Sequence, residues 1–206
     1  MTIDVGTGDG RAVLAVAGAE PTTLVLGLDA DAASMVEASR RAARPARRGG
    51  RPNARFVVAA AERPPVPLLG AAHLVTVRFP WGSLLRGCLG LDAAVAAGVA
   101  GLVATEGTLE LTLAPALHDG LDGLPLEPAE VELAAAGTFE PIGLRLIEAR
   151  PATDAEIGTT WGRRLLRGGG RGQRRSERQR RSERQPGGER QPGGERQPRT
   201  LRFRAS

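Results

Sequence analysis

Short apolar segments alternate with helix-like segments along most of the chain, and this alternation limits the possible folds more than any other feature. We expect strands at residues 2–5, 23–28, 55–59, 74–79, 108–113 and 142–149. Helices are expected between them, at residues 11–17, 32–44, 93–102 and 128–136. Strands that alternate with helices form a parallel sheet with helices on both faces. The sequence therefore predicts an α/β protein with a doubly wound, mostly parallel sheet.

The positive charge of the chain is concentrated at its end. Residues 168–206 carry 12 Arg and 4 Glu, whereas residues 1–167 carry 16 Arg and 19 Asp and Glu. Inside this end, RRSERQ occurs twice at residues 174–185 and PGGERQ twice at residues 186–197. Such repeats cannot bury enough surface to offset the entropy of ordering them. We expect a folded body over residues 1–167 and a disordered insertion over residues 168–198. Residues 199–206, where Leu201 and Phe203 alternate with polar residues, are expected to return to the sheet as an edge strand.

Composition excludes several classes of protein. The chain has one Cys, so it cannot form an internal disulfide. It lacks an apolar run of the roughly 18 residues that a membrane span needs, and a secretory signal at its start. A cytoplasmic protein that does not enter a membrane is expected. His73 and His118 lack neighbours at metal-ligand spacing, so no metal site is predicted, and Cys88 is expected to be a small buried residue. Every basic side chain is Arg, which a GC-rich codon usage explains without any ligand.

A glycine-rich loop follows the first expected strand and precedes the first expected helix. It reads Asp4-Val-Gly6-Thr-Gly8-Asp-Gly10, and glycines at such a point let the backbone turn tightly and approach a ligand closely. The second strand ends at Asp29, where a carboxylate can accept hydrogen bonds from ribose hydroxyls. The third ends near Ala61 and Glu62, where an adenine would lie. Three successive strand ends of this kind predict an adenosyl cofactor. A plain structural turn for the loop, and an N-cap role for Asp29, are the alternatives.

Two Trp residues occur in loops that are expected at the same edge of the sheet. Trp81 lies in the segment FPWGSLLRG after the fourth strand, and Trp161 lies in TTWGRRL after the sixth strand. Two planar side chains there can hold a base that has been pulled from its stack. The alternative is that each Trp packs against the rim of the core.

The segments DVGTGDG, FPWGSLLRG and TTWGRRL together resemble the aminoglycoside-resistance methyltransferases that act on N1 of adenine-1408 in 16S rRNA. The resemblance covers residues 2–167 and the last strand. It implies a Rossmann-like, seven-stranded sheet with an antiparallel last strand, an S-adenosylmethionine (SAM) cofactor, and a monomer that acts on the 30S ribosomal subunit. The hexapeptide repeats are not typical of this family, nor is the use of Arg where its members often have Lys.

The resemblance also implies roles for particular residues. Trp81 and Trp161 would grip the target adenine. The cofactor pocket would include Asp4, Gly6, Gly8, Asp29, Ala61, Glu62, Ser83 and Thr159. The residues expected to bind rRNA are Arg40, Arg41, Arg44, Arg47, Arg48, Arg51, Arg86, Arg163 and Arg164. For the cluster at residues 40–51, a solvated helix face is the alternative.

Two other functions are compatible with the sequence. One is a different RNA methyltransferase of the same class, such as a tRNA guanine-N7 enzyme. Members of that family place Lys- and His-rich residues after the Pro-Trp pair, and Gly82-Ser83-Leu84-Leu85 lacks them. The other is a ribosome-binding relative without catalytic activity.

Overall fold

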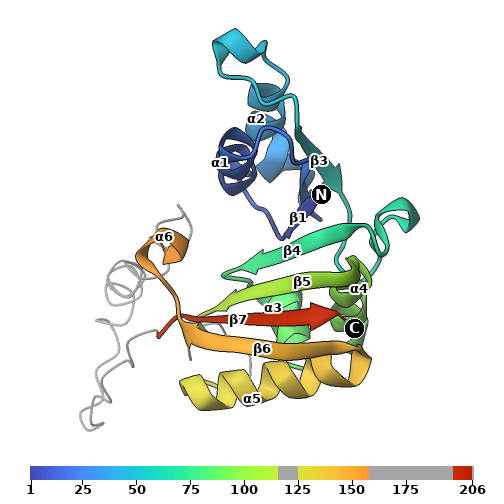
Figure 1. The fold of residues 1–206 in the computed structure, drawn as a ribbon, viewed down its shortest axis with the longest axis vertical. Coiled ribbons are helices and arrows are strands. Elements are labelled where there is room, and N and C mark those ends of the chain that lie inside the picture. Colours follow the sequence, from blue (N-terminus) through green and yellow to red (C-terminus); the bar gives the residue numbers. More distant parts are fainter. Residues whose placement is uncertain (116–124, 158–196, 206) are drawn as a thin grey trace, which may run out of the picture.

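The computed structural model describes residues 1–115, 125–157 and 197–205. Seven strands form one sheet in the order β3-β2-β1-β4-β5-β7-β6 (Figure 1). The strands are β1 (Thr2–Val5), β2 (Val25–Asp29), β3 (Ala54–Val58), β4 (Ala72–Arg78), β5 (Val103–Leu113), β6 (Leu144–Pro151) and β7 (Arg199–Ala205). Strands β1 to β5 pair in parallel, whereas β7 runs antiparallel to both β5 and β6. The predicted α/β class, with its mostly parallel sheet and antiparallel last strand, is confirmed.

Most helices lie where the sequence predicts them. They are α1 (Arg11–Ala19), α2 (Ala32–Ala42), α3 (Gly82–Cys88), α4 (Ala93–Gly101), α5 (Pro128–Phe139) and α6 (Asp154–Ile157), with 3-10 turns η1 (Ala46–Arg48), η2 (Val66–Leu68) and η4 (Glu140–Ile142). Helix α2 ends two residues earlier than expected, since the residue before Pro45 is disfavoured in a helical conformation. Helices α3 and α6 were not predicted, because seven and four residues are too few to show a helical period.

Helices cover the two faces of the sheet unequally. On one face, α1 and α2 pack over β2 and β3 through a small cluster that includes Val13, Val25, Ala38 and Ala54. On the other face, α3, α4 and α5 bury the larger cluster, which includes Leu85, Val99, Leu109, Phe139 and Phe203. The smaller cluster reaches only β2 and β3, whereas the larger one extends across the sheet to β6 and β7.

Strand β7 lies inside the sheet, so its expected place at an edge was wrong. Leu201 and Phe203 are fully buried, and the ring of Phe203 lies 5.4 Å from that of Phe139. The strand enters between β5 and β6, and Pro151 of β6 pairs with Arg199. Pairing with a neighbouring strand along each edge, together with the burial of Leu201 and Phe203, explains why so short a segment is ordered. Residues 168–196 lie outside the described residues, and the division of the chain into body, insertion and last strand stays a prediction.

The strand order reverses between β1 and β4. From β1 the chain adds β2 and β3 on one side, and then returns to add β4 and β5 on the other. In open α/β sheets, ligands bind outside the carboxyl ends of the strands at such a reversal. The glycine-rich loop follows β1 and the Pro80-Trp81 segment follows β4, so both lie at this point of the sheet.

Candidate active site

The glycine loop after β1 is built for close approach of a ligand. Gly6, Gly8 and Gly10 have φ values of 69°, 55° and 66°, a region that other L-residues rarely adopt. A side chain at Gly6 would collide with Leu84, and one at Gly10 would collide with the ring of Phe56. At Gly8, by contrast, nothing lies within 4 Å of the position that a Cβ would take. The loop therefore packs on the protein at Gly6 and Gly10, and presents open space at Gly8.

Asp29, the last residue of β2, is tied to this loop. Its Oδ2 accepts a hydrogen bond of 2.8 Å from the backbone N–H of Gly8, and its Oδ1 accepts one of 2.9 Å from Asp31 N–H. The N-cap of α2 is Asp31, which accepts a hydrogen bond from Ala33 N–H. The N-cap alternative for Asp29 is therefore wrong. A carboxylate has about four acceptor sites, so Asp29 keeps capacity for the two hydroxyls of a ribose.

Ala61 and Glu62 follow β3 at the same edge. Ala59 N–H donates to the carbonyl of Asp29, which continues the pairing of β3 with β2 beyond Val58. The Ala61 carbonyl lies against α4 at Gly98, where an added Cβ would come within 1.9 Å of it. Ala61 is half-buried and Glu62 is exposed. Gly98 was not singled out from the sequence, although an isolated glycine inside an Ala-rich helix indicates a close backbone approach.

Asp4 is the most buried of the predicted cofactor residues that the structure describes. It is 5% exposed, and its Oδ1 accepts hydrogen bonds from Thr76 Oγ1 at 2.6 Å and from Arg78 Nη1 at 2.7 Å. Neither partner was predicted from the sequence. The signal was available, since Arg78 is a charged residue at the end of a largely buried strand and such a charge needs a partner.

Trp81 projects from the end of β4 into solvent. Its side chain is 72% exposed, and it is the N-cap residue of α3. The alternative in which Trp81 packs against the rim of the core is therefore wrong. Ser83, in the first turn of α3, is also exposed.

The backbone around Trp81 is held in an unusual conformation. Phe79 has a φ of 49° although it is not a glycine, and Gly82 has a φ of 58°. Phe79 is 2% exposed, and its N–H donates to the carbonyl of Thr112 in β5. A left-handed bulky residue costs of order 1–3 kcal/mol and persists only where its surroundings hold it. Burial of Phe79 thus aims the next residues, including Trp81, out of the sheet.

The remaining part of the predicted base-binding loop lies outside the described residues. This applies to Trp161, Thr159, Arg163 and Arg164. The described chain reaches Ile157, at the end of α6. Those four assignments stay predictions.

Helix α6 is fixed by a carboxylate with several partners. Glu156 accepts two hydrogen bonds from the Arg150 guanidinium, at 2.8 and 2.9 Å, and others from the backbone N–H and hydroxyl of Thr153. The hydrogen bonds from Arg150 and Thr153 lower the pKa of Glu156 to about 2, against the opposing effect of burial. Thr153 and Glu156, three residues later, form a capping box, which was not predicted from the sequence.

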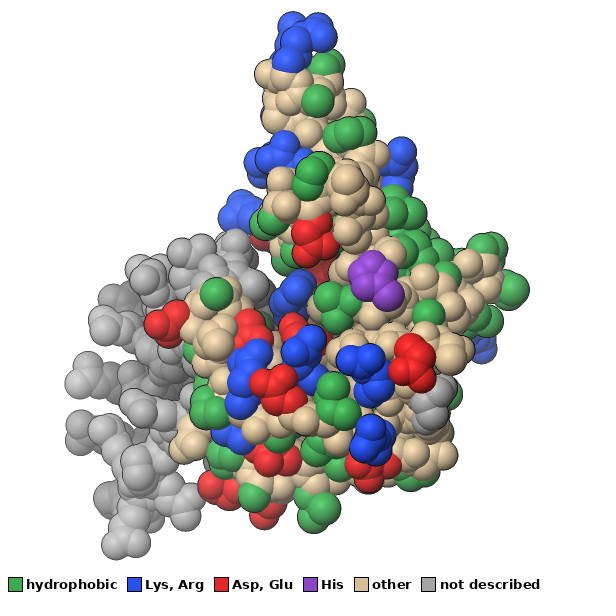
Figure 2. All heavy atoms as spheres, viewed as in Figure 1, with side chains coloured by type: hydrophobic (Ala, Val, Ile, Leu, Met, Phe, Trp, Pro, Cys, Tyr) green, Lys and Arg blue, Asp and Glu red, His purple; other side chains and the backbone are tan. Residues whose placement is uncertain are grey.

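Basic side chains gather around the end of α2 and η1, the narrow part of the molecule at the top of Figure 2. The exposed members are Arg40, Arg41, Arg44, Arg47 and Arg48. Only a long contact of 3.7 Å joins Arg44 to Glu37. Arg51 differs, since its guanidinium is half-buried against Gly18 of α1 and donates to the Gly50 carbonyl. Arg86 is half-buried too, and donates weakly to the Leu91 carbonyl at 3.4 Å.

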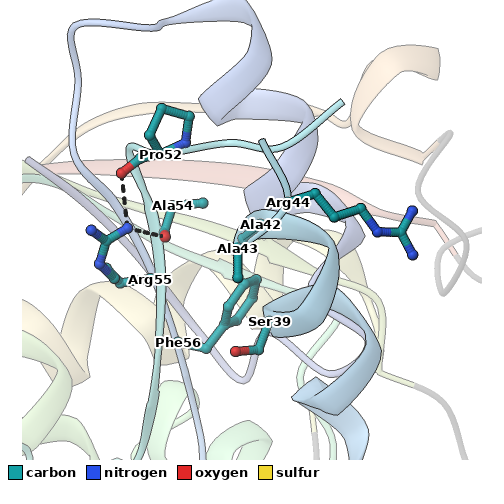
Figure 3. A pocket seen from close by; sticks show the side chains of 8 residues that line it. All are labelled: Ser39, Ala42, Ala43, Arg44, Pro52, Ala54, Arg55 and Phe56. Atoms are coloured by element: carbon teal, nitrogen blue, oxygen red, sulfur yellow. Dashed lines mark hydrogen bonds between the residues drawn. The ribbon is translucent and has the colours of Figure 1, made fainter. Parts of the chain in front are cut away.

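A hollow of about 400 Å³ adjoins this basic segment, between α2 and the amino-terminal half of β3 (Figure 3). Its lining residues are Ser39, Ala42, Ala43, Arg44, Pro52, Ala54, Arg55 and Phe56. Arg55 is held by hydrogen bonds to the carbonyls of Pro52 and Ala54, whereas Arg44 extends away from the hollow. Asp29 pairs with Val58 at the opposite end of β3, so the hollow lies toward the other end of this strand. Phe56, which lines the hollow, also lies against Gly10 of the glycine loop.

Cys88 and the two His residues were weaker candidates for a functional role. Cys88 is fully buried, and burial raises the pKa of its thiol to about 12. His73 is exposed and contacts the N-terminal amine, and His118 lies outside the described residues. No group of three His, Cys, Asp or Glu that could hold a metal occurs in the described part of the chain.

Among the described residues, one bent pair of helices has the length and composition that a membrane span needs. No single helix there is both long and apolar enough to cross a bilayer. Helices α3 and α4 meet the criteria of length and composition only when taken together, and they are bent by 80°.

Comparison with known proteins identifies the family. The family model described as "NpmA: 16S rRNA (adenine(1408)-N(1))-methyltransferase" matches residues 1–180. A 16S rRNA (adenine(1408)-N(1))-methyltransferase of Streptoalloteichus hindustanus is 35% identical over 175 residues, which cover 80% of each chain.

Solved structures agree with this match. The aminoglycoside resistance methyltransferase NpmB1 is 36% identical with a TM-score of 0.73, and the match covers 100% of this chain and 86% of that one. A variant of the 16S rRNA (adenine(1408)-N(1))-methyltransferase from Catenulisporales acidiphilia, solved with cosubstrate SAM, is 28% identical with a TM-score of 0.76. That match covers 99% of this chain and 84% of the other. Since these matches extend over nearly the whole sheet and its glycine loop, the chain belongs to the NpmA family of 16S rRNA (adenine(1408)-N(1))-methyltransferases.

Proposed function

We propose that this protein transfers a methyl group from SAM to N1 of adenine-1408 in the 16S rRNA of the 30S subunit, and thereby confers resistance to aminoglycosides. The observation that carries the proposal is the placement of an exposed Trp81 at the end of β4, beside the open glycine loop of β1. This arrangement puts a stacking surface for a base next to space for a cofactor.

The residues present fit SAM. Open space at Gly8 accommodates a ligand against the backbone, and Asp29 retains acceptor sites for the ribose hydroxyls. Ala61 and Glu62 lie beyond the end of β3, where an adenine ring would rest. The cofactor supplies an electrophilic methyl group on a sulfonium. Everything else that the reaction needs is positioning, which this chain's own residues provide.

The target nitrogen needs no general base. N1 of adenine carries an available lone pair at neutral pH, so the protein has only to align it in line with the methyl–sulfur bond. Correct alignment can supply at most about 7–11 kcal/mol of barrier lowering. Extrusion of the base costs a few kcal/mol, and stacking on aromatic side chains returns about 1–3 kcal/mol. We assign this stacking to Trp81, with Trp161 as the second plane.

The exposed Arg residues around α2 and η1 suit contact with the rRNA backbone. Guanidinium groups bind phosphates in two-pronged geometry, and such contacts set register without reading sequence. Arg40, Arg41, Arg44, Arg47 and Arg48 are exposed and available for this. Arg51 and Arg86 are half-buried, so we assign them a smaller share. A cytoplasmic monomer that meets the assembled 30S subunit completes the proposal.

Primer extension on 30S subunits tests the proposal. Subunits incubated with the full chain and SAM are expected to give a stop next to adenine-1408, and a reaction without SAM serves as control. A modified guanine in tRNA would instead indicate the guanine-N7 reaction. Binding to 30S subunits without any measurable binding of SAM by titration calorimetry would indicate a ribosome-binding relative that has lost catalysis.

A further inference from the structure

The hollow between α2 and β3 has an aromatic wall that is held in place. This wall is the half-buried ring of Phe56. The edge of the ring that carries Cδ1, Cε1 and Cζ lies so close to Gly10 and Gly27 that a Cβ at either glycine would collide with it. On the other side of the hollow, Ser39 and Ala43 of α2 face the ring (Figure 3). The volume of about 400 Å³ is within the range of about 300–1,000 Å³ that is usual for small-molecule pockets.

The charged residues that line the hollow are both Arg. They are Arg44 and Arg55, and residues 39–56, which supply the whole lining, contain seven Arg and no Asp or Glu. Arg55 donates from Nη1 to the carbonyls of Pro52 and Ala54, so its guanidinium is fixed while Nε and Nη2 can still donate to an anion. A ligand that matches this hollow therefore combines an apolar or aromatic part with a negative charge.

A nucleotide has both parts. Its base is planar and can stack on an aromatic ring, and its phosphate pairs with guanidinium groups. An inorganic anion would leave Phe56 without a contact, and an uncharged apolar ligand would leave Arg44 and Arg55 without one. In a double helix the base is stacked between its neighbours, so only an unpaired nucleotide can enter such a hollow.

We infer that the hollow binds an unpaired nucleotide of the 16S rRNA other than the target adenine, with its base against Phe56 and its phosphate on Arg44 and Arg55. The inference rests on the proposed function, which supplies the RNA. Trp81, assigned to the target base, follows β4, and β1 and β2 separate β4 from β3 in the sheet. The hollow is thus a second point of contact. It recognises an unpaired base at a fixed place, which contacts to phosphates alone do not.

The hollow can be filled without a change of charge. Ala43 is the exposed C-cap residue of α2, so the larger side chain of Ala43→Leu occupies the hollow and leaves the core intact. Ser39→Leu fills the hollow from one turn earlier on the same helix. Ala94→Leu, at an exposed position of α4 on the other face of the sheet, is the matched control. Phe56 itself is left in place, because its ring also supports Gly10 of the glycine loop.

Binding of the full chain to 30S subunits, measured at several salt concentrations, provides the test. Both filling variants are expected to weaken binding about 5-fold or more, since the stacking contact of one base is lost. The slope of affinity against salt concentration is expected to stay the same, because every Arg is retained. With saturating protein, chemical probing of the 16S rRNA bases is expected to show one unpaired base besides adenine-1408 that the unmodified protein and Ala94→Leu protect. Ala43→Leu is expected to leave that base reactive.

Native 30S affinity of both filling variants would overturn the inference, and binding of AMP that these variants lose would then assign the hollow to a free nucleotide. Weaker 30S binding without a change in the reactivity of any base would also overturn it, and would indicate a segment of a ribosomal protein in the hollow. In both cases the proposed function stands as long as the unmodified protein methylates adenine-1408. Absence of that methylation would remove the proposed function itself.

Discussion

The carboxylate of Asp29 accepts a hydrogen bond of 2.8 Å from the backbone N–H of Gly8. This contact joins the end of β2 to the middle of the loop that follows β1, so two adjacent strand ends act as one rigid edge. The same carboxylate accepts from Asp31 N–H, which fixes its orientation. A pre-oriented carboxylate loses little entropy when it binds, which favours its role as the ribose acceptor.

Replacement of Asp29 tests this role. Asp29→Ala is expected to weaken SAM binding by about 1.5–3 kcal/mol, the range for hydrogen bonds to a charged acceptor. Asp31→Ala is the matched control, because it removes a carboxylate two residues away that caps α2. The control is expected to lower stability by about 1 kcal/mol and leave SAM affinity unchanged. Equal affinities of the two variants for SAM, measured by calorimetry, would contradict the assignment.

The low pKa of Glu156 predicts that part of the free energy of unfolding is lost in acid. Its folded-state pKa is about 2, below its usual value of 4.5, because Arg150 and Thr153 bind the ionised form. The stabilisation is therefore fully present above pH 4.5, and is lost as the pH falls from 4.5 toward 2. It amounts to about 1–3 kcal/mol. Denaturant unfolding of the native chain and of Glu156→Gln is expected to give stabilities that differ at pH 6 and converge near pH 2. A difference that stays constant over this range would show that the hydrogen bonds from Arg150 and Thr153 do not lower the pKa of Glu156.

The basic segment predicts a salt-dependent interaction with rRNA. Simultaneous replacement of Arg40, Arg41 and Arg44 by Glu is expected to weaken 30S binding and to flatten its dependence on salt concentration, because fewer counterions are released. SAM affinity is expected to survive, since these side chains lie away from the glycine loop. Binding measured at several salt concentrations gives the slope. The same slope in the native and substituted proteins would indicate a solvated helix face instead.

Because β7 is part of the sheet, we expect two deletions near the end of the chain to change the thermal midpoint differently. Removal of residues 170–196 is expected to leave the thermal midpoint nearly unchanged, because the body and β7 keep their contacts. Removal of residues 170–206 also takes away Leu201 and Phe203, which are fully buried and contribute about 1.5–3 kcal/mol each. A large drop in the thermal midpoint is therefore expected only for the longer deletion. Equal midpoints would contradict the contribution of β7.

Much of the fold could be predicted from local patterns. Strand β2 could be recognised because it lies in a continuous apolar run, and α5 because it has several turns and a Pro near its start. Helix α3 could not be, because its seven residues, which begin with the left-handed Gly82, show no period. The interior position of β7 depends on pairing across distant parts of the chain, which no local pattern contains.

The residues of the candidate site also differ in whether the sequence could predict them. Gly8 and Asp29 could be located because they follow strands, and strand ends meet at one edge of a parallel sheet. The partners of Asp4 could not, because Thr76 and Arg78 are more than 70 positions away and only the sheet register brings them together. The positive φ of Phe79 is likewise set by burial between strands, and its residue type gives no sign of it.

Methylation of 30S subunits by Trp81 variants shows whether Trp81 stacks on the extruded adenine. Trp81→Ala is expected to reduce the methylation rate at least 10-fold, with its thermal midpoint and SAM affinity close to those of the native protein, because the side chain is 72% exposed. Trp81→Phe is expected to retain more activity than Trp81→Ala, since stacking needs an aromatic plane. If Trp81→Ala methylates adenine-1408 at the native rate, or loses activity only in proportion to a loss of folded protein, Trp81 does not hold the base.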